Sequence, residues 1–517
     1  MGSNPFSLNI HELGQVRKHC PQMFEGLSAD NLPSSPSSEL LWGVEPLTDP
    51  LDQLPPELVS EIFLLCQAKD PSSKKPSWME ITVSHVCQHW RRRALSTPRL
   101  WSTINARCTV TTPNRIEAYL ARSKSALLDI TIWIRGSHYD KNGPELVPLI
   151  LPKIIQQCRR WQRLDLRVSV RMNFWAIYGG LFANISVPQL AVLEIDMCHS
   201  PDPAPLPDPP ADAFTPNMFE VDSAQKLRRV TFRVHGQDSV WTHSPRYPMP
   251  PLASIEGLSL SLDHAPSALI PFAALEEATG SLRHLRLQAV GALQPQALHH
   301  PVKLQNLTSL WLDNFRPSLT DFPVSGGVVF PALTYLVLQG GSYFKDSQLQ
   351  VSALRASFPA LKHLAYTLCA INKDSQIEAD YLSNMAWHIS TLTLIETVRL
   401  PEDPSIEGLI ASPNWTNLKT VRFSFIGGVT VESQRVLEMV KAAMKGAKSL
   451  REKRGGTPGL ELEMRRRMVW ELRERFPVTM EQAEESFPLT EVESIAIGWP
   501  LPQISVISPL DFGPTGD

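Results

Sequence analysis

The stretch LRHLRLQ (282–288) decides the fold, because its arrangement of leucines returns along the chain as LTSLWLD (307–313) and LTYLVLQ (333–339). At the end of each copy, apolar residues alternate with variable residues. Alternation with a period of two is typical of a β-strand that buries one face. Leu285 and Leu287 are therefore expected to point inward, and the residues beside them to face solvent.

Ten such copies occur between about residues 125 and 425, with starts roughly 23 to 37 residues apart, a spacing at which internal repeats build solenoids. They are WQRLDLR (161–167), LAVLEID (190–196), LRRVTFR (227–233), IEGLSLS (255–261), LRHLRLQ (282–288), LTSLWLD (307–313), LTYLVLQ (333–339), LKHLAYT (361–367), IETVRLP (395–401) and LKTVRFS (418–424). One strand cannot bury its apolar face alone, whereas stacked strands can. The sequence therefore predicts an α/β solenoid; the alternative is an ordinary α/β domain with leucine-rich strands.

After residue 428 the pattern changes to a helical one. VESQRVLEMVKAAMKGAKSL (431–450) has an apolar stripe at helical spacing, and LELEMRRRMVWELRERF (460–476) continues in a similar style. Thr479 and Gln482 have the spacing of a capping box for a further short helix. We expect these helices to cap the end of the array.

Composition restricts the classes of partner and compartment. The 517 residues carry a formal net charge of -3, which gives no global attraction to nucleic acid or acidic membranes. The seven cysteines form no CxxC pair, which argues against disulfides or a zinc ribbon and favours a reducing compartment. The chain has no signal-like start and no apolar run of about 18 residues. We therefore expect a cytoplasmic or nuclear protein without a membrane partner.

The segment before the repeats predicts a small helical module. In LDQLPPELVSEIF (51–63) two prolines pre-set a first helical turn, and an apolar face continues to Leu65. A polar loop, KDPSSKKPS (69–77), leads to a second helix that is expected to run from Trp78 to the residues before Pro98. Its apolar stripe consists of Val83, Val86, Cys87, Trp90 and Ala94. Such a small unit usually keeps apolar area for a partner.

VSHVCQHWRRRALSTPRLW (83–101) also suggests a metal site or a phosphate clamp. His85 and His89 share a face of the expected helix, but Cys87 points elsewhere and no third ligand is near. The three arginines that follow Trp90 spread over too wide an arc to clamp one phosphate. We therefore expect no metal and assign the stretch to protein docking.

LPPELVSEIF, the polar loop, VSHVCQHWRRRALSTPRLW and the repeats, in this order, resemble fungal F-box proteins with trailing leucine-rich-like repeats. The asparagine that usually follows the leucine pattern in such repeats is generally absent, so we expect an irregular array. The expected parts are an N-terminal segment (1–50), an F-box (51–104), the array (105–428) and a helical cap with a tail (429–517).

The resemblance implies a substrate-recognition subunit of a Skp-cullin-F-box type ubiquitin ligase. The F-box would dock onto a Skp-type adaptor, and through it a cullin, while the repeats would bind a protein target. The resemblance implies an adaptor-binding and core surface, in which the sequence does not divide contact residues from core residues. Its residues are Leu54, Pro55, Leu58, Ile62, Val86, Trp90 and Trp101. For the target, we expect the solvent side of the strands to contribute Asp165, Arg233, Arg286, Trp311 and Asp313.

No catalytic constellation such as GxSxG, HExxH or a Walker loop occurs, so we expect neither an enzyme nor a cofactor. The alternative functions are an F-box or leucine-rich-repeat scaffold that acts outside a ligase, and a repeat protein that binds nucleic acid through its arginines. The second is disfavoured because basic residues are interleaved with acidic ones.

Overall fold

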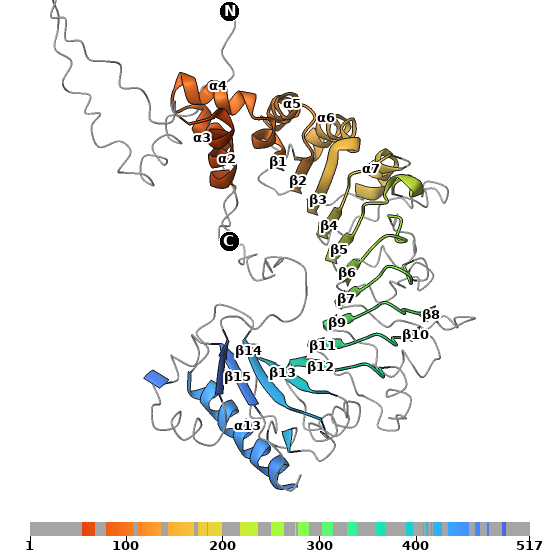
Figure 1. Cartoon of the computed structure of the whole chain (residues 1–517). Coiled ribbons are helices and arrows are strands. Elements are labelled where there is room, and N and C mark those ends of the chain that lie inside the picture. Colours follow the sequence, from red (N-terminus) through yellow and green to blue (C-terminus); the bar gives the residue numbers. More distant parts are fainter. Residues whose placement is uncertain are drawn as a thin grey trace, which may run out of the picture. The chain divides into compact units, whose positions relative to one another are not determined.

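The structure is a computed structural model, and it describes part of the chain (Figure 1). The described residues are 54–67, 79–107, 111–135, 143–169, 174–183, 185–198, 218–235, 250–262, 275, 278–288, 302–313, 328–339, 358–367, 389–396, 407, 410–411, 415, 417–425, 433–453, 461–465, 473–474 and 489–492. The chain divides into two units, Met1–Val59 and Ser60–Asp517. Of the first unit, the described part is 54–59; the expected N-terminal segment 1–50 lies outside the described residues.

The first described elements are the helices of the expected module. They are α2 (Pro56–Gln67), α3 (Met79–Ser84), α4 (Gln88–Ser96) and the 3-10 helix η3 (Pro98–Trp101). The prediction of one continuous second helix is wrong, because α3 ends at Ser84 and a turn separates it from α4. Cys87 caps α4, its Sγ accepting a hydrogen bond from the Trp90 backbone N–H at 3.4 Å.

The repeats form one 14-stranded sheet in which every neighbouring pair is parallel and the strands follow chain order (Figure 1). Its strands are β1 (Thr103–Arg107), β2 (Leu128–Arg135), β3 (Trp161–Ser169), β4 (Val192–Cys198), β5 (Arg229–His235), β6 (Gly257–Leu262), β7 (His284–Gln288), β9 (Ser309–Asp313), β11 (Tyr335–Gln339), β12 (His363–Thr367), β13 (Thr391–Glu396), β14 (Thr420–Phe425), β15 (Glu461–Arg465) and β16 (Leu489–Val492). The short strands β8 (Val302–Lys303) and β10 (Val328–Val329) pair separately. The predicted α/β repeat architecture is confirmed.

Nine of the ten leucine patterns coincide with strands, and the copy IETVRLP (395–401) lies outside the described residues beyond Glu396. Of that copy, Ile395 and Glu396 belong to β13, which begins earlier, at Thr391. The pattern also missed β1 and β2, whose sequences TINAR and LDITIWIR alternate without the leucine spacing.

Each repeat begins with the same backbone arrangement. The first apolar residue of the pattern is buried and closes a turn, as when the Leu333 N–H donates to the Phe330 carbonyl at 3.3 Å. The next N–H donates to the preceding repeat, as from Thr308 to the Arg283 carbonyl at 2.8 Å and from Thr334 to the Thr308 carbonyl at 3.0 Å. Equivalent bonds link repeats from β3 to β15. They fix the register between neighbours, so the core leucines of successive strands align.

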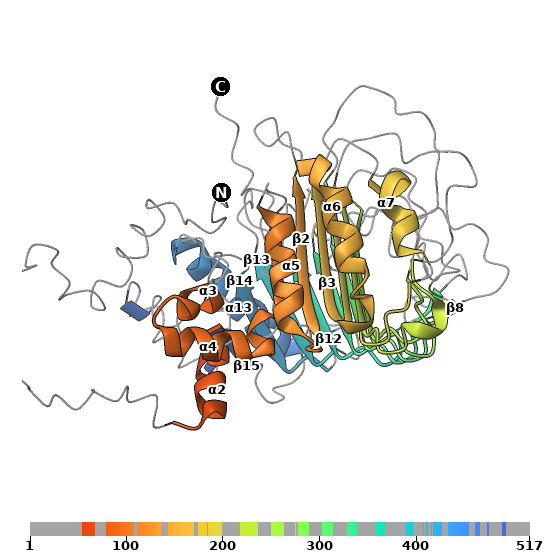
Figure 2. The same ribbon diagram turned by 90° about the horizontal axis from the view of Figure 1, so that it is seen from above.

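Helices cover one face of the first part of the sheet. These are α5 (Thr112–Ser123), α6 (Gly143–Ile155) and α7 (Phe174–Phe182), together with the short 3-10 helices η4 (Cys158–Arg160) and η5 (Val221–Ser223). In Figure 2, α5, α6 and α7 lie in front of the strands, and α5 contacts β1 while α6 contacts β2. The core lies between these helices and the inward side chains of the strands.

After β14 the chain forms one long helix and returns to the sheet. Helix α13 (Ser433–Lys453) confirms the first C-terminal helix, and its buried side includes Val440 and Ala443. The helical interpretation of 460–476 is wrong at residues 461–465, which form β15 and pair with β14. Thr479 and Gln482 lie outside the described residues.

Candidate protein-interaction surfaces

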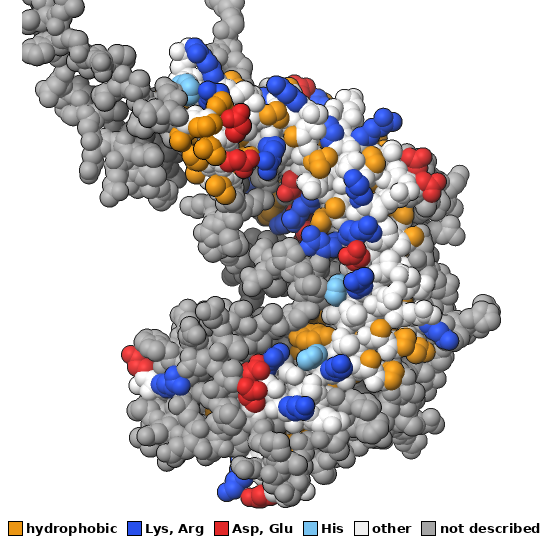
Figure 3. All heavy atoms as spheres, in the orientation of Figure 1, with side chains coloured by type: hydrophobic (Ala, Val, Ile, Leu, Met, Phe, Trp, Pro, Cys, Tyr) orange, Lys and Arg blue, Asp and Glu red, His pale blue; other side chains and the backbone are white. Residues whose placement is uncertain are grey.

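The helical module presents large apolar side chains to solvent. On α2, Leu58, Ile62 and Leu65 are exposed, Leu65 by 72%, and Val86, in the turn after α3, is 55% exposed. Figure 3 shows hydrophobic side chains gathered over this part of the molecule. The spacing i, i+4, i+7 places the three α2 residues on one face of the helix. Ile62, Leu65 and Val86 all belong to the unit Ser60–Asp517, and exposed apolar residues of this kind mark an interaction surface.

Of the residues expected to form the adaptor-binding and core surface, Trp101 belongs to the core. Its side chain is fully buried, and its Nε1 donates to the Ala94 carbonyl at 2.8 Å. Tyr119 meets the indole edge-on at 5.2 Å, and Arg122 lies over the ring at 4.3 Å. Trp101 thereby joins the module to the first repeat helix.

The remaining predicted adaptor residues are Leu54, Pro55 and Trp90, and they differ in exposure. Trp90 is half-buried, with its ring centroid 5.4 Å from that of Phe63 on α2. Leu54 is half-buried and Pro55 is exposed. Leu58, Ile62 and Val86 are thus the predicted adaptor residues that expose most apolar surface.

A buried polar network connects the module to helix α5. The Tyr119 hydroxyl donates to Glu80 Oε1 at 2.5 Å, and Gln67 donates to Glu80 Oε2 at 3.3 Å and to the Leu100 carbonyl at 2.9 Å. Burial raises the pKa of Glu80, although these hydrogen bonds and the charge of Arg115 act in the opposite direction. Sequence analysis missed this network because Glu80 and Tyr119 are distant in sequence.

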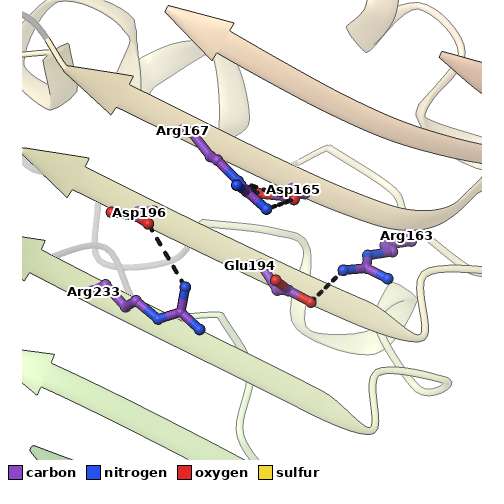
Figure 4. A network of polar contacts seen from close by, with 6 residues as sticks. All are labelled: Arg163, Asp165, Arg167, Glu194, Asp196 and Arg233. Carbon is purple, nitrogen blue, oxygen red and sulfur yellow. Dashed lines mark hydrogen bonds and ion pairs between the residues drawn. The ribbon is translucent and has the colours of Figure 1, made fainter. Parts of the chain in front are cut away.

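The polar face of the sheet consists of the residues that alternate with the buried apolar side chains of each strand. On β3, β4 and β5 it holds a charged network (Figure 4). Its ion pairs are Arg163–Glu194 at 2.7 Å, Arg167–Asp165 at 2.9 Å and Arg233–Asp196 at 3.7 Å. Burial raises the pKa of Glu194, while the charge of Arg163 acts against that increase. Each arginine is opposed by one carboxylate, so the network is formally neutral.

Further along the polar face, the aromatic side chains Trp311 and Tyr335 lie among polar side chains of β7, β9, β11 and β12. The guanidinium of Arg286 lies 4.5 Å from the centre of the Trp311 ring and donates to Asp313 at 3.3 Å. Trp311 and Tyr335 pack against the buried pair Val337 and Ala365. This part of the face could contact an apolar or aromatic group of a ligand.

The predicted target-binding residues share the polar face but differ in exposure. Arg233, Arg286 and Trp311 are half-buried, whereas Asp165 and Asp313 are buried. All five lie on the polar face, and the two aspartates are buried there because arginines of the same face pair with them.

Trp133 on β2 is a polar-face residue that sequence analysis missed. Arg107 and Arg167 stack on it, at 5.7 and 4.6 Å from the ring centre. The available signal was the strict alternation in LDITIWIR (128–135), which places Trp133 on the face opposite the isoleucines.

Among the described helices, none has the length and apolar character needed to cross a bilayer. No family model matches the sequence, and no curated protein matches it either. Among solved structures, the chain is similar to a Bacteroides fragilis protein determined by a structural-genomics consortium. That alignment has 10% identity and a TM-score of 0.27, and covers 72% of this chain and 77% of the other.

Proposed function

We propose that this chain is the non-catalytic substrate-recognition subunit of a Skp-cullin-F-box type ubiquitin ligase, acting in the cytoplasm or nucleus. The helical module docks onto a Skp-type adaptor, which links it to a cullin. The sheet binds a protein target. Ubiquitin transfer is carried out by other subunits of the ligase.

The observation that carries this proposal is the exposed apolar surface of the module. Leu58, Ile62 and Val86 are exposed in the structure, and they are three of the seven positions to which the F-box resemblance assigns adaptor binding. Burying a large apolar side chain contributes about 1.5 to 3 kcal/mol, so three such residues provide a useful affinity. The array that follows is long enough to offer a separate surface to a target.

Adaptor binding is tested by co-purification and by titration with a recombinant Skp-type adaptor. Ile62→Asp and Val86→Asp place a charge in the proposed contact, and each is expected to weaken binding by about 30-fold or more. Because both side chains are exposed, the fold is expected to remain intact. Trp90→Ala is a less selective test, since Trp90 also packs against Phe63.

Leu149→Asp is the matched control. Leu149 is an equally large apolar residue that is 54% exposed, but it lies on α6 beside the sheet. It is expected to leave adaptor affinity unchanged. Wild-type-like binding by both Ile62→Asp and Val86→Asp would exclude this surface as the docking site.

The scaffold alternative predicts that the adaptor co-purifies without a cullin. Mass spectrometry of the purified complex distinguishes the two functions, because a ligase subunit recovers both proteins. Nucleic-acid binding is distinguished by salt: it would weaken steeply as the salt concentration rises. The charged network on β3 to β5 does not favour it, because each arginine there is paired with a carboxylate.

A further inference from the structure

Two arginines of the polar face lie on either side of a pair of serines. Arg233 is on β5 and Arg286 on β7, and the strand between them carries Ser259 and Ser261. The register pairs Arg233 with Ser261, and Ser259 with Arg286. Two strand spacings, about 10 Å, therefore separate the arginines across the sheet, and two residues, about 7 Å, separate them along the strands. Arginine side chains are long enough to approach one small group placed over the serines.

Two polar atoms at this place have no hydrogen-bond partner. Ser261 is 2% exposed, and its Oγ makes no hydrogen bond. The Nε of Arg286 is buried and also makes none. A buried polar atom without a partner costs free energy, which a bound ligand can recover.

The two guanidinium groups are engaged only in part by carboxylates of the face. The nearest carboxylate oxygen to Arg233, on Asp196, is 3.7 Å away, beyond hydrogen-bond distance. Arg286 reaches Asp313 at 3.3 Å through one nitrogen. By contrast, Arg167 holds Asp165 through two nitrogens. Arg233 and Arg286 therefore keep donors available for another acceptor.

The two arginines carry like charges, and each has one carboxylate near it: Asp196 lies 3.7 Å from Arg233, and Asp313 lies 3.3 Å from Arg286. Burial lowers the pKa of Arg286, Asp313 acts against this, and the positive charge of Arg233 lowers it further. The two like charges thus repel each other. Trp311 supports the Arg286 guanidinium from one side and limits its orientation.

We propose that Arg233, Ser261 and Arg286 bind a compact oxyanion of the protein target, either a phosphate monoester or a carboxylate. This inference rests on the proposed function, because it names the chemistry that the polar face recognises in the target. Guanidinium groups present paired donors that match both kinds of oxyanion. The bound anion separates the two positive charges and accepts from the unpaired donors.

The test compares thermal unfolding of the full chain in inorganic phosphate, acetate and chloride at equal ionic strength. Phosphate stabilises proteins generally, so the measured quantity is the difference between the wild type and its variants. Phosphate or acetate is expected to raise the midpoint of the wild type more than that of Arg233→Gln or Arg286→Gln. A larger shift with phosphate indicates a phosphorylated target, and a larger shift with acetate indicates an acidic one.

Two further variants sharpen the result. Arg228→Gln removes an exposed arginine that pairs with Glu256 just before β5, and it is expected to behave as the wild type. Ser261→Asp places a carboxylate between the arginines, so it is expected to raise the midpoint in chloride and to abolish the additional anion effect. If all variants respond to both anions as the wild type does, the site is excluded.

Adaptor co-purification, measured on the same samples, separates this inference from the proposed function. Arg233→Gln is expected to retain the adaptor, because Arg233 lies in the sheet. If the wild type binds no adaptor but shows the anion effect, the ligase proposal fails and the oxyanion site stands. If the adaptor binds and the anion effect is absent, the oxyanion site fails and the ligase proposal stands.

Discussion

Gly180 lies in helix α7 and Gly446 in helix α13. A methyl group added by substitution with alanine would have different neighbours at the two positions. At Gly180 a Cβ would have nothing within 4 Å, whereas at Gly446 it would lie 2.7 Å from the carbonyl oxygen of Glu407. The close approach at Gly446 joins α13 to the segment that precedes β14. Lys445 strengthens the same contact through an ion pair with Glu407 at 2.8 Å.

We expect Gly446→Ala to destabilise the protein by about 1 to 3 kcal/mol, because the backbone at Glu407 must move. Gly180→Ala is the control, and it should stabilise by about 0.5 to 1 kcal/mol because alanine favours the helix. The free energy of unfolding from urea titration measures both. Equal effects at the two positions would contradict the packing of α13 described here.

At the scale of single elements, the leucine pattern located strands wherever the buried residues were regularly spaced. At IETVRLP (395–401) the described residues end at Glu396, and the strand that pairs with β12 and β14 is β13 (Thr391–Glu396). Leu462 and Met464 fit both a helical stripe and an alternating strand. Pairing with β14, which is distant in sequence, selects the strand.

The sequence predicts which apolar residues belong to the helical module, but it does not predict which of them are exposed and which are buried. Val86 and Trp101 both appear as apolar residues of one motif, yet Val86 is exposed while Trp101 is buried against Tyr119. The difference arises from the turn before α4 and from packing against α5. Neither feature appears in the spacing of apolar residues.

The contact between the module and helix α5 should depend on pH through Glu80. Its pKa is raised by burial, so the folded state holds the proton more tightly than the unfolded state. The stabilisation from protonated Glu80 is complete below the ordinary carboxyl pKa. It is lost as the pH rises through the raised value.

Glu80→Gln removes this titration and keeps an acceptor for the Tyr119 hydroxyl. We expect the free energy of unfolding of the wild type to fall relative to that of Glu80→Gln as the pH rises through this window. Urea titrations at a series of pH values measure the difference. Glu117→Gln, on the exposed side of α5, should follow the wild type. Parallel profiles for the wild type and Glu80→Gln would show that Glu80 does not titrate in this way.

The order of strands in the parallel sheet distinguishes a solenoid from an ordinary α/β domain. Each strand pairs with the strands of the neighbouring repeats in chain order, and the backbone bonds at the repeat starts also join neighbours. Stability in such an array is approximately a sum of terms within repeats and between adjacent repeats. A local defect should therefore weaken its neighbours first.

Leu310→Ala and Leu193→Ala test this locality at two places in the sheet. Leu310 is buried in β9 and Leu193 in β4, so each change should cost about 2 to 5 kcal/mol through a cavity. Under native conditions, Leu310→Ala should increase amide hydrogen exchange in β7, β9 and β11 before β3 and β5, and Leu193→Ala should show the reverse order. Mass spectrometry of exchanged peptides resolves these strands. If both variants instead lose exchange protection equally in all strands, the sheet unfolds as one cooperative core. That result would contradict a repeat array that is stabilised between neighbours.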